Sequence, residues 1–160
     1  MEPYDILYVD NDPNNLSGFA FLFGKKFTIL LAESGEEGLE ILKSNAVRLI
    51  ISDFRMPEMS GLDFLRSVRK QQTHTKFILL VGHTDNHVLE EVVGDRGVFL
   101  YTKPFDSEEL MCLIEDELHS YQIPQNGDQL DRSFQFRKKS PEPLVKRNFE
   151  YACTEELTQL

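Results

Sequence analysis

Five short apolar runs alternate with helix-like segments along the first 120 residues, and this alternation limits the possible folds more than any other feature of the chain. Runs without polar alternation are typical of strands that are buried on both faces of a parallel sheet. The sequence therefore predicts an α/β fold, a doubly wound five-stranded parallel sheet with helices on both faces. The predicted strands are 5–10, 27–31, 48–53, 76–81 and 98–102.

Capping residues mark where several of the intervening helices begin. Asp12 precedes Pro13, a pair that favours a helix start at the proline. Ser34 and Glu37 have the spacing of a capping box, and Asp106 is placed to cap the last helix. Two further helices are predicted over 61–70 and 85–95.

Charge and residue composition divide the chain into two parts. Residues 1–120 carry 21 acidic and 11 basic side chains, a net charge of −10, whereas residues 121–160 carry six of each. A body this acidic repels phosphates, so no nucleic-acid partner is expected. We predict one domain over 1–121, followed by a mostly irregular extension or linker over 122–160 with room for one short helix.

Neither a membrane segment nor a disulfide is expected. No apolar run approaches the ~20 residues that a membrane-spanning helix needs, and the acidic N-terminus is unlike a signal peptide. Cys112 and Cys153 are far apart, which favours free thiols in a reducing compartment. The sequence thus predicts a cytoplasmic protein that does not contact membranes.

Acidic residues end two of the predicted strands, and a lysine follows a third. Asp10, Asp12 and Asp53 would crowd carboxylates at one edge of the sheet, where they repel one another. Mg²⁺ relieves such repulsion, and Lys103 supplies a fixed positive charge. A carboxylate, a Mg²⁺ site and a lysine are the parts that an aspartate needs to accept a phosphoryl group.

Three motifs stand out: Asp10-Asn11-Asp12-Pro13, the segment Asp53-Phe54-Arg55-Met56-Pro57-Glu58-Met59-Ser60-Gly61, and Lys103-Pro104-Phe105. They resemble those of the response-regulator receiver domain of two-component systems, the domain type of the chemotaxis receivers. The resemblance covers residues 4–121. It implies a flavodoxin-like fold with strand order 2-1-3-4-5, a cis bond before the proline of the lysine motif, and phosphotransfer from a sensor histidine kinase or a phosphotransfer protein of a phosphorelay.

The resemblance also implies a role for individual residues. Asp53 would be the phosphoacceptor, Lys103 would contact the phosphoryl oxygens, and Gly82 would let the phosphoryl group approach. For the side chain of Arg55 two roles stay open, shielding of the phosphoryl group or simple solvation. The expected Mg²⁺ ligands are Asp10, Asn11, Asp53 and the backbone carbonyl of Arg55, with Asp12 as an additional candidate.

Three positions depart from the family pattern. Asn11 stands where a metal-binding aspartate is usual, Val81 where a switch hydroxyl is usual, and Leu100 where an aromatic residue is usual. The chain is expected to be a signalling domain and not an enzyme. Phosphorylation would switch a protein-interaction surface on the fourth helix, fifth strand and fifth helix, which would bind a downstream effector or a second copy of the chain. These departures also leave open an adaptor that works without phosphorylation.

A phosphatase similar to the haloacid dehalogenases is a remote alternative. The Asp10-Asn11-Asp12 segment follows an apolar strand, so Asp10 would be the nucleophile and Asp12 the acid. Against this, Asn14 occupies the position of a usual Thr or Val.

Overall fold

The computed structural model describes residues 2–71, 75–85, 87–92, 95 and 97–120. Its five parallel strands form one sheet in the order β2-β1-β3-β4-β5, which confirms the predicted fold and strand order. The predicted extension over 122–160 lies outside the described residues. In chain order the elements are β1 (Tyr4–Val9), α1 (Pro13–Phe23), β2 (Ile29–Ala32), α2 (Gly35–Ser44), β3 (Val47–Asp53), α3 (Gly61–Gln71), β4 (Lys76–Val81), α4 (His87–Val92), β5 (Val98–Thr102) and α5 (Ser107–His119).

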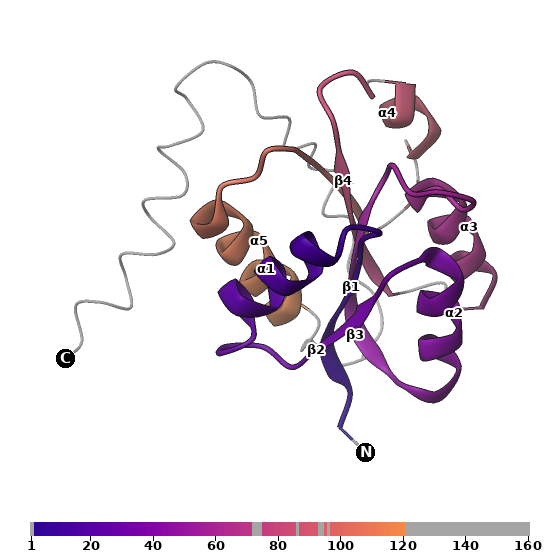
Figure 1. The fold of residues 1–160 in the computed structure, drawn as a ribbon. Coiled ribbons are helices and arrows are strands. Elements are labelled where there is room, and N and C mark those ends of the chain that lie inside the picture. The colour runs from indigo at the N-terminus through magenta and orange to yellow at the C-terminus, as the bar shows by residue number, and fades with distance from the viewer. Residues whose placement is uncertain (1, 72–74, 86, 93–94, 96, 121–160) are drawn as a thin grey trace, which may run out of the picture.

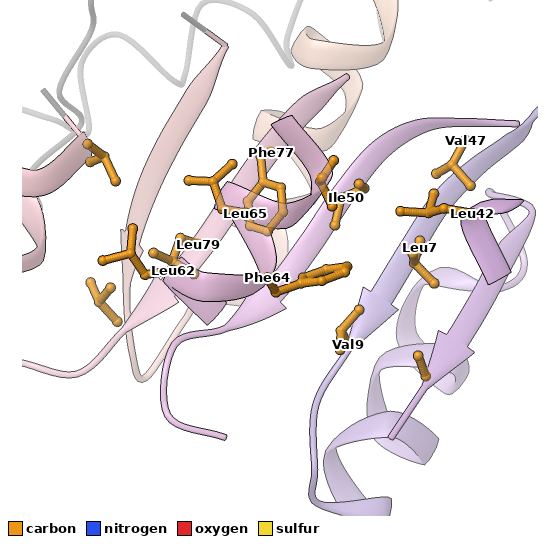
Figure 2. Close-up of a cluster of buried hydrophobic side chains, with 14 of the residues drawn as sticks. Leu7, Val9, Leu42, Val47, Ile50, Leu62, Phe64, Leu65, Phe77 and Leu79 are labelled. Atoms are coloured by element: carbon orange, nitrogen blue, oxygen red, sulfur yellow. The ribbon is translucent and has the colours of Figure 1, made fainter. Parts of the chain in front are cut away.

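Helices cover both faces of the sheet, and each face has its own apolar core. Helices α1 and α5 lie on one face, and α2, α3 and α4 lie on the other (Figure 1). Figure 2 shows the core under α2 and α3, where Phe64 and Leu65 pack against Phe77 and Leu79 of β4. The three central strands are buried on both faces, which explains their unbroken apolar sequences.

The predicted caps are present at three helix starts. The side chain of Asp12 accepts a hydrogen bond from the backbone N–H of Asn14, and that of Ser34 accepts one from Glu37. Asp106 accepts two, from the N–H groups of Glu108 and Glu109. Each cap satisfies donors that the first helical turn leaves without partners.

Strands β1 and β3 and helix α3 differ from their predicted bounds by one residue at one or both ends, whereas β2 and α4 differ by more. Strand β2 begins at Ile29 instead of residue 27, because the backbone of Phe27 still bonds to the carbonyl of Phe23 at the end of α1. Helix α4 begins at His87 instead of residue 85, because the side chain of Asp85 folds back onto the backbone N–H of Gly82. Within the described ranges, no helix has the length and apolar character needed to cross a membrane.

Candidate functional site

Asp53 and Lys103 meet at the carboxyl edge of the sheet. Asp53 is the last residue of β3, and Lys103 directly follows β5. The Nζ atom of Lys103 lies 3.0 Å from Oδ1 of Asp53 and 3.7 Å from Oδ2 of Asp10. The peptide bond between Lys103 and Pro104 is cis, as the resemblance implied, and the N–H of Lys103 donates to the carbonyl of Val81. One ammonium group therefore contacts two carboxylates.

The Asp53 carboxyl is only 13% exposed, and its surroundings favour the protonated form. Burial raises the pKa of Asp53 above its ordinary value of 3.8, and the charge of Asp10 raises it further. The ammonium of Lys103 and the backbone N–H of Arg55 lower this pKa and offset only part of the effect. A carboxylate that is poorly solvated in this way is a more reactive nucleophile than one in water.

The Asp10 carboxylate is buried and held by donors of the protein. Its Oδ2 accepts hydrogen bonds from the hydroxyl of Tyr8 and the side-chain amide of Asn15, both at 3.0 Å, and its Oδ1 accepts one from the backbone N–H of Asp12. Tyr8 also stacks on Phe19, with ring centroids 3.9 Å apart. These bonds fix the orientation of Asp10.

Sequence reasoning missed Tyr8 and Asn15 as part of this site. Alternation along β1 places Tyr8 on the same face as Asp10, and a tyrosine in an otherwise apolar strand needs a partner for its hydroxyl. That pattern was a usable signal for Tyr8. Asn15 gave none, because its contact with Asp10 depends on how α1 docks.

Oxygen donors for a cation gather around Asp53. Asp10 directly follows β1 and Asp53 ends β3, and these two strands are neighbours in the sheet. Asn11 is the residue after Asp10, and Arg55 lies two residues after Asp53. Asp12, in contrast, uses its side chain to cap α1. Within the described ranges, no three His, Cys, Asp or Glu side chains form a group that could hold a metal ion by themselves. Any such site therefore depends on amide and carbonyl oxygens as well as on the two carboxylates.

The two switch positions that depart from the family pattern, Val81 and Leu100, carry apolar side chains that pack in apolar surroundings. Val81 is 7% exposed and belongs to the core under α2, α3 and α4, and Leu100 packs against the same core. Their strands are neighbours, with Val81 paired to Thr102 in the sheet. The side chain of Val81 offers no hydrogen-bond donor at the end of β4.

Arg55 is neither freely solvated nor placed directly over Asp53. Its guanidinium forms an ion pair with Asp85, at 2.7 Å between Nη2 and Oδ1, and donates from Nη2 to the hydroxyl of Thr84. The preceding residue, Phe54, contacts the ring of His87 edge-on. The loop after the acceptor is thus joined to the start of α4, a connection that no sequence motif indicated.

Gly61 closes the loop that begins at Asp53. Its N–H donates to the carbonyl of Phe54, and a Cβ atom at this position would lie 2.3 Å from the carbonyl oxygen of Asp53 and 2.6 Å from a methyl group of Leu79. Only glycine allows α3 to start this close to the acceptor.

Comparisons with known proteins agree with this geometry. A family model described as "Response regulator receiver domain" matches residues 6–115. The transcriptional regulatory protein GlrR of Escherichia coli is 32% identical over 154 residues, which span 94% of this chain and 33% of that protein. The DNA-binding transcriptional regulator NtrC of the same species is 35% identical over 107 residues, 65% of this chain and 22% of that protein.

Solved structures give the same result. A response regulator receiver domain protein from Clostridium thermocellum has a TM-score of 0.66 at 31% identity, covering 74% of this chain and 97% of that chain. The apo receiver domain of nitrogen regulatory protein C has a TM-score of 0.66 at 29% identity, covering 77% and 100%. The chain spans a third or less of the length of the two regulators named above, GlrR and NtrC.

Proposed function

Because the chain belongs to the response regulator receiver family of two-component systems, we propose that it is a phosphorylation-switched signalling domain whose acceptor is Asp53. The observation that carries this proposal is the contact of Lys103 with both Asp53 and Asp10. The donor would be the phosphohistidine of a sensor kinase or of a phosphotransfer protein. A cytoplasmic location is part of the proposal.

The reaction is a direct transfer. A carboxylate oxygen of Asp53 attacks the phosphorus of phosphohistidine, an O–P bond forms as the N–P bond breaks, and the imidazole nitrogen leaves and takes up a proton. Lys103, which contacts Asp10, would neutralise charge on the transferred oxygens. Gly82, which directly follows β4, would let the phosphoryl group approach.

The oxygen donors around Asp53 fit Mg²⁺, which prefers one or two carboxylates together with neutral oxygens and water. Asp10, Asn11, Asp53 and the carbonyl of Arg55 would hold it. When bound, the cation would screen charge on the phosphoryl oxygens. Because Asn11 contributes no charge, we expect weaker binding of Mg²⁺ than an aspartate at this position would give.

Binding of beryllofluoride, a mimic of the phosphoryl group on a carboxylate, tests the proposal. In the presence of Mg²⁺, titration should perturb the NMR resonances around Asp53 in the wild type and leave those of Asp53→Asn unchanged. A wild-type protein that does not respond to beryllofluoride at any Mg²⁺ concentration would sink the proposal.

A phosphorylation-independent adaptor is the second candidate, and the apolar character of Val81 and Leu100 favours it. In that case the surface of α4, β5 and α5 binds its effector in the same way whether or not Asp53 carries a phosphoryl group. Equal effector affinity of the wild type and of Asp53→Ala, with and without beryllofluoride, would select the adaptor.

A further inference from the structure

The ion pair between Arg55 and Asp85 links the loop after the acceptor to the turn before α4. The guanidinium contacts both carboxylate oxygens, with Nε at 3.1 Å from Oδ1 and 3.2 Å from Oδ2. Its Nη2 lies 2.7 Å from Oδ1 and also donates to Thr84 at 2.9 Å. Arg55 and Asp85 are 30 positions apart in sequence, so their ion pair fixes one loop against another.

Asp85 depends on this pair because its carboxylate is buried. The side chain is 2% exposed, and its other observed donor is the backbone N–H of Gly82, at 2.9 Å. A Cβ atom on residue 82 would lie 3.0 Å from Oδ2 of Asp85, so the glycine also makes room for the carboxylate. Removal of the guanidinium would leave the buried charge of Asp85 without a cation. We expect the turn before α4 to rearrange so that this carboxylate reaches solvent or another donor.

Arg55 is also placed to sense the state of Asp53. It lies two residues after the acceptor, and its backbone N–H donates to the Asp53 carboxyl. The negative charge of Asp53 acts on its guanidinium, and the side chain is 67% exposed, so little packing opposes its rotation.

We propose that Arg55 exchanges partners when Asp53 is phosphorylated: its guanidinium leaves Asp85 and Thr84 and binds the phosphoryl oxygens. Asp85 then loses its counter-charge, and the turn before α4 rearranges. This inference rests on the proposed function and deepens it, because it supplies a route from Asp53 to α4 that does not need a hydroxyl at Val81 or an aromatic ring at Leu100.

The competition favours the phosphoryl group in charge, and the geometry of the guanidinium suits both partners. A phosphoryl group carries a charge of roughly −1.5 to −2 near neutral pH, compared with −1 on the Asp85 carboxylate. A guanidinium binds phosphate oxygens with two parallel N–H donors, as it does a carboxylate. The signal then reaches α4 because this helix, which Val88 and Val92 anchor in the core, follows the turn directly.

Beryllofluoride titrations of two variants test the exchange, with opposite expected signs. Asp85→Asn removes the competitor for the guanidinium but keeps an acceptor for Gly82, so its affinity for beryllofluoride should rise about two- to fivefold. Arg55→Gln removes the guanidinium that would bind the beryllofluoride group and should lower the affinity by a similar factor. Asp95→Asn is the matched control: it disrupts another Arg–Asp pair, with Arg69, and should leave the affinity unchanged.

The methyl resonances of Val88 and Val92 give the second measurement. In the wild type they should shift on addition of beryllofluoride, and in free Asp85→Asn they should already lie toward the bound positions. In Arg55→Gln, beryllofluoride should still perturb the surroundings of Asp53 and leave the methyl groups of α4 unmoved.

The outcomes separate the two proposals. If Arg55→Gln binds beryllofluoride as tightly as the wild type and its α4 methyl groups shift to the same extent, partner exchange is wrong while Asp53 remains the acceptor. If the wild type itself does not bind beryllofluoride, the proposed function fails, and the exchange fails with it.

Discussion

The ammonium of Lys103 lies 3.0 Å from the carboxylate of Asp53, and this ion pair joins the ends of β5 and β3 across β4. Lys103 lowers the pKa of Asp53, whereas burial raises it. The lysine therefore offsets part of the effect that burial has on the pKa of the acceptor.

Replacement of this lysine should make the acceptor harder to ionise. In Lys103→Met, the pKa of Asp53 should rise further, and the free energy of unfolding at neutral pH should fall by about 1–2 kcal/mol, since two carboxylates lose their cation. Carboxyl NMR titration and urea unfolding measure the two effects. Lys43→Met, which removes the exposed pair with Glu40, should change neither quantity measurably.

Neutralisation of the acceptor should stabilise the fold near neutral pH. The folded-state pKa of Asp53 lies above 3.8, so the ionised side chain lowers stability at any pH above that raised value. Asp53→Asn removes this penalty, and its melting temperature should exceed that of the wild type at pH 7. The difference should shrink as the pH falls through the raised pKa and vanish below about 3.8, where the folded and unfolded wild-type chains are both protonated.

Asp63→Asn serves as the comparison for this pH series. Asp63 is an exposed carboxylate in the first turn of α3, with more than half of its side chain accessible. It should give no gain at pH 7. A wild-type chain that is as stable as Asp53→Asn across the whole pH range would show that the acceptor site carries no penalty.

A methyl group at Gly61 should damage the acceptor loop. Gly61→Ala places a Cβ against the carbonyl of Asp53 and should lower the free energy of unfolding by about 1–3 kcal/mol, because backbone atoms must move. Gly18 in α1 has open space around it, so Gly18→Ala should raise stability by roughly 0.5–1 kcal/mol through helix propensity. Chemical denaturation of both variants checks these opposite signs, and equal losses would contradict the account.

The hydroxyl of Tyr8 should contribute to stability through Asp10. Tyr8→Phe removes a donor at 3.0 Å from a buried carboxylate and should cost about 0.5–1.5 kcal/mol, measured by urea unfolding. Tyr4→Phe, at the half-buried start of the same strand, is the control and should cost less. A larger loss for Tyr4→Phe would show that the contact with Asp10 is unimportant for folding.

Local signals were enough to predict most of the fold. The bounds of β4 and β5 were predicted correctly, because their apolar runs end at polar residues, and the caps at Asp12, Ser34 and Asp106 act over two or three residues. Helix α4 was predicted too long at its start, because the side chain of Asp85 bonds to Gly82 instead of starting a helix. That contact forms because the fold buries the side chain of Asp85, and a single sequence does not show which polar side chains are buried.

The site was predictable only in part, for the same reason. Asp10, Asp53 and Lys103 were found because they follow strands whose ends share one edge of the sheet. The pair between Arg55 and Asp85 connects two loops 30 residues apart, and neither residue type marks it in the sequence.

Chemical phosphorylation followed by peptide mass spectrometry tests the central claim most directly. With Mg²⁺ and a small acyl phosphate donor, the wild type should gain one hydroxylamine-labile phosphoryl group on the peptide that contains Asp53. Asp53→Asn should gain none, and chelation of Mg²⁺ should suppress the gain in the wild type. A wild-type chain that gains no phosphoryl group, or a gain that persists unchanged in Asp53→Asn, would contradict the account.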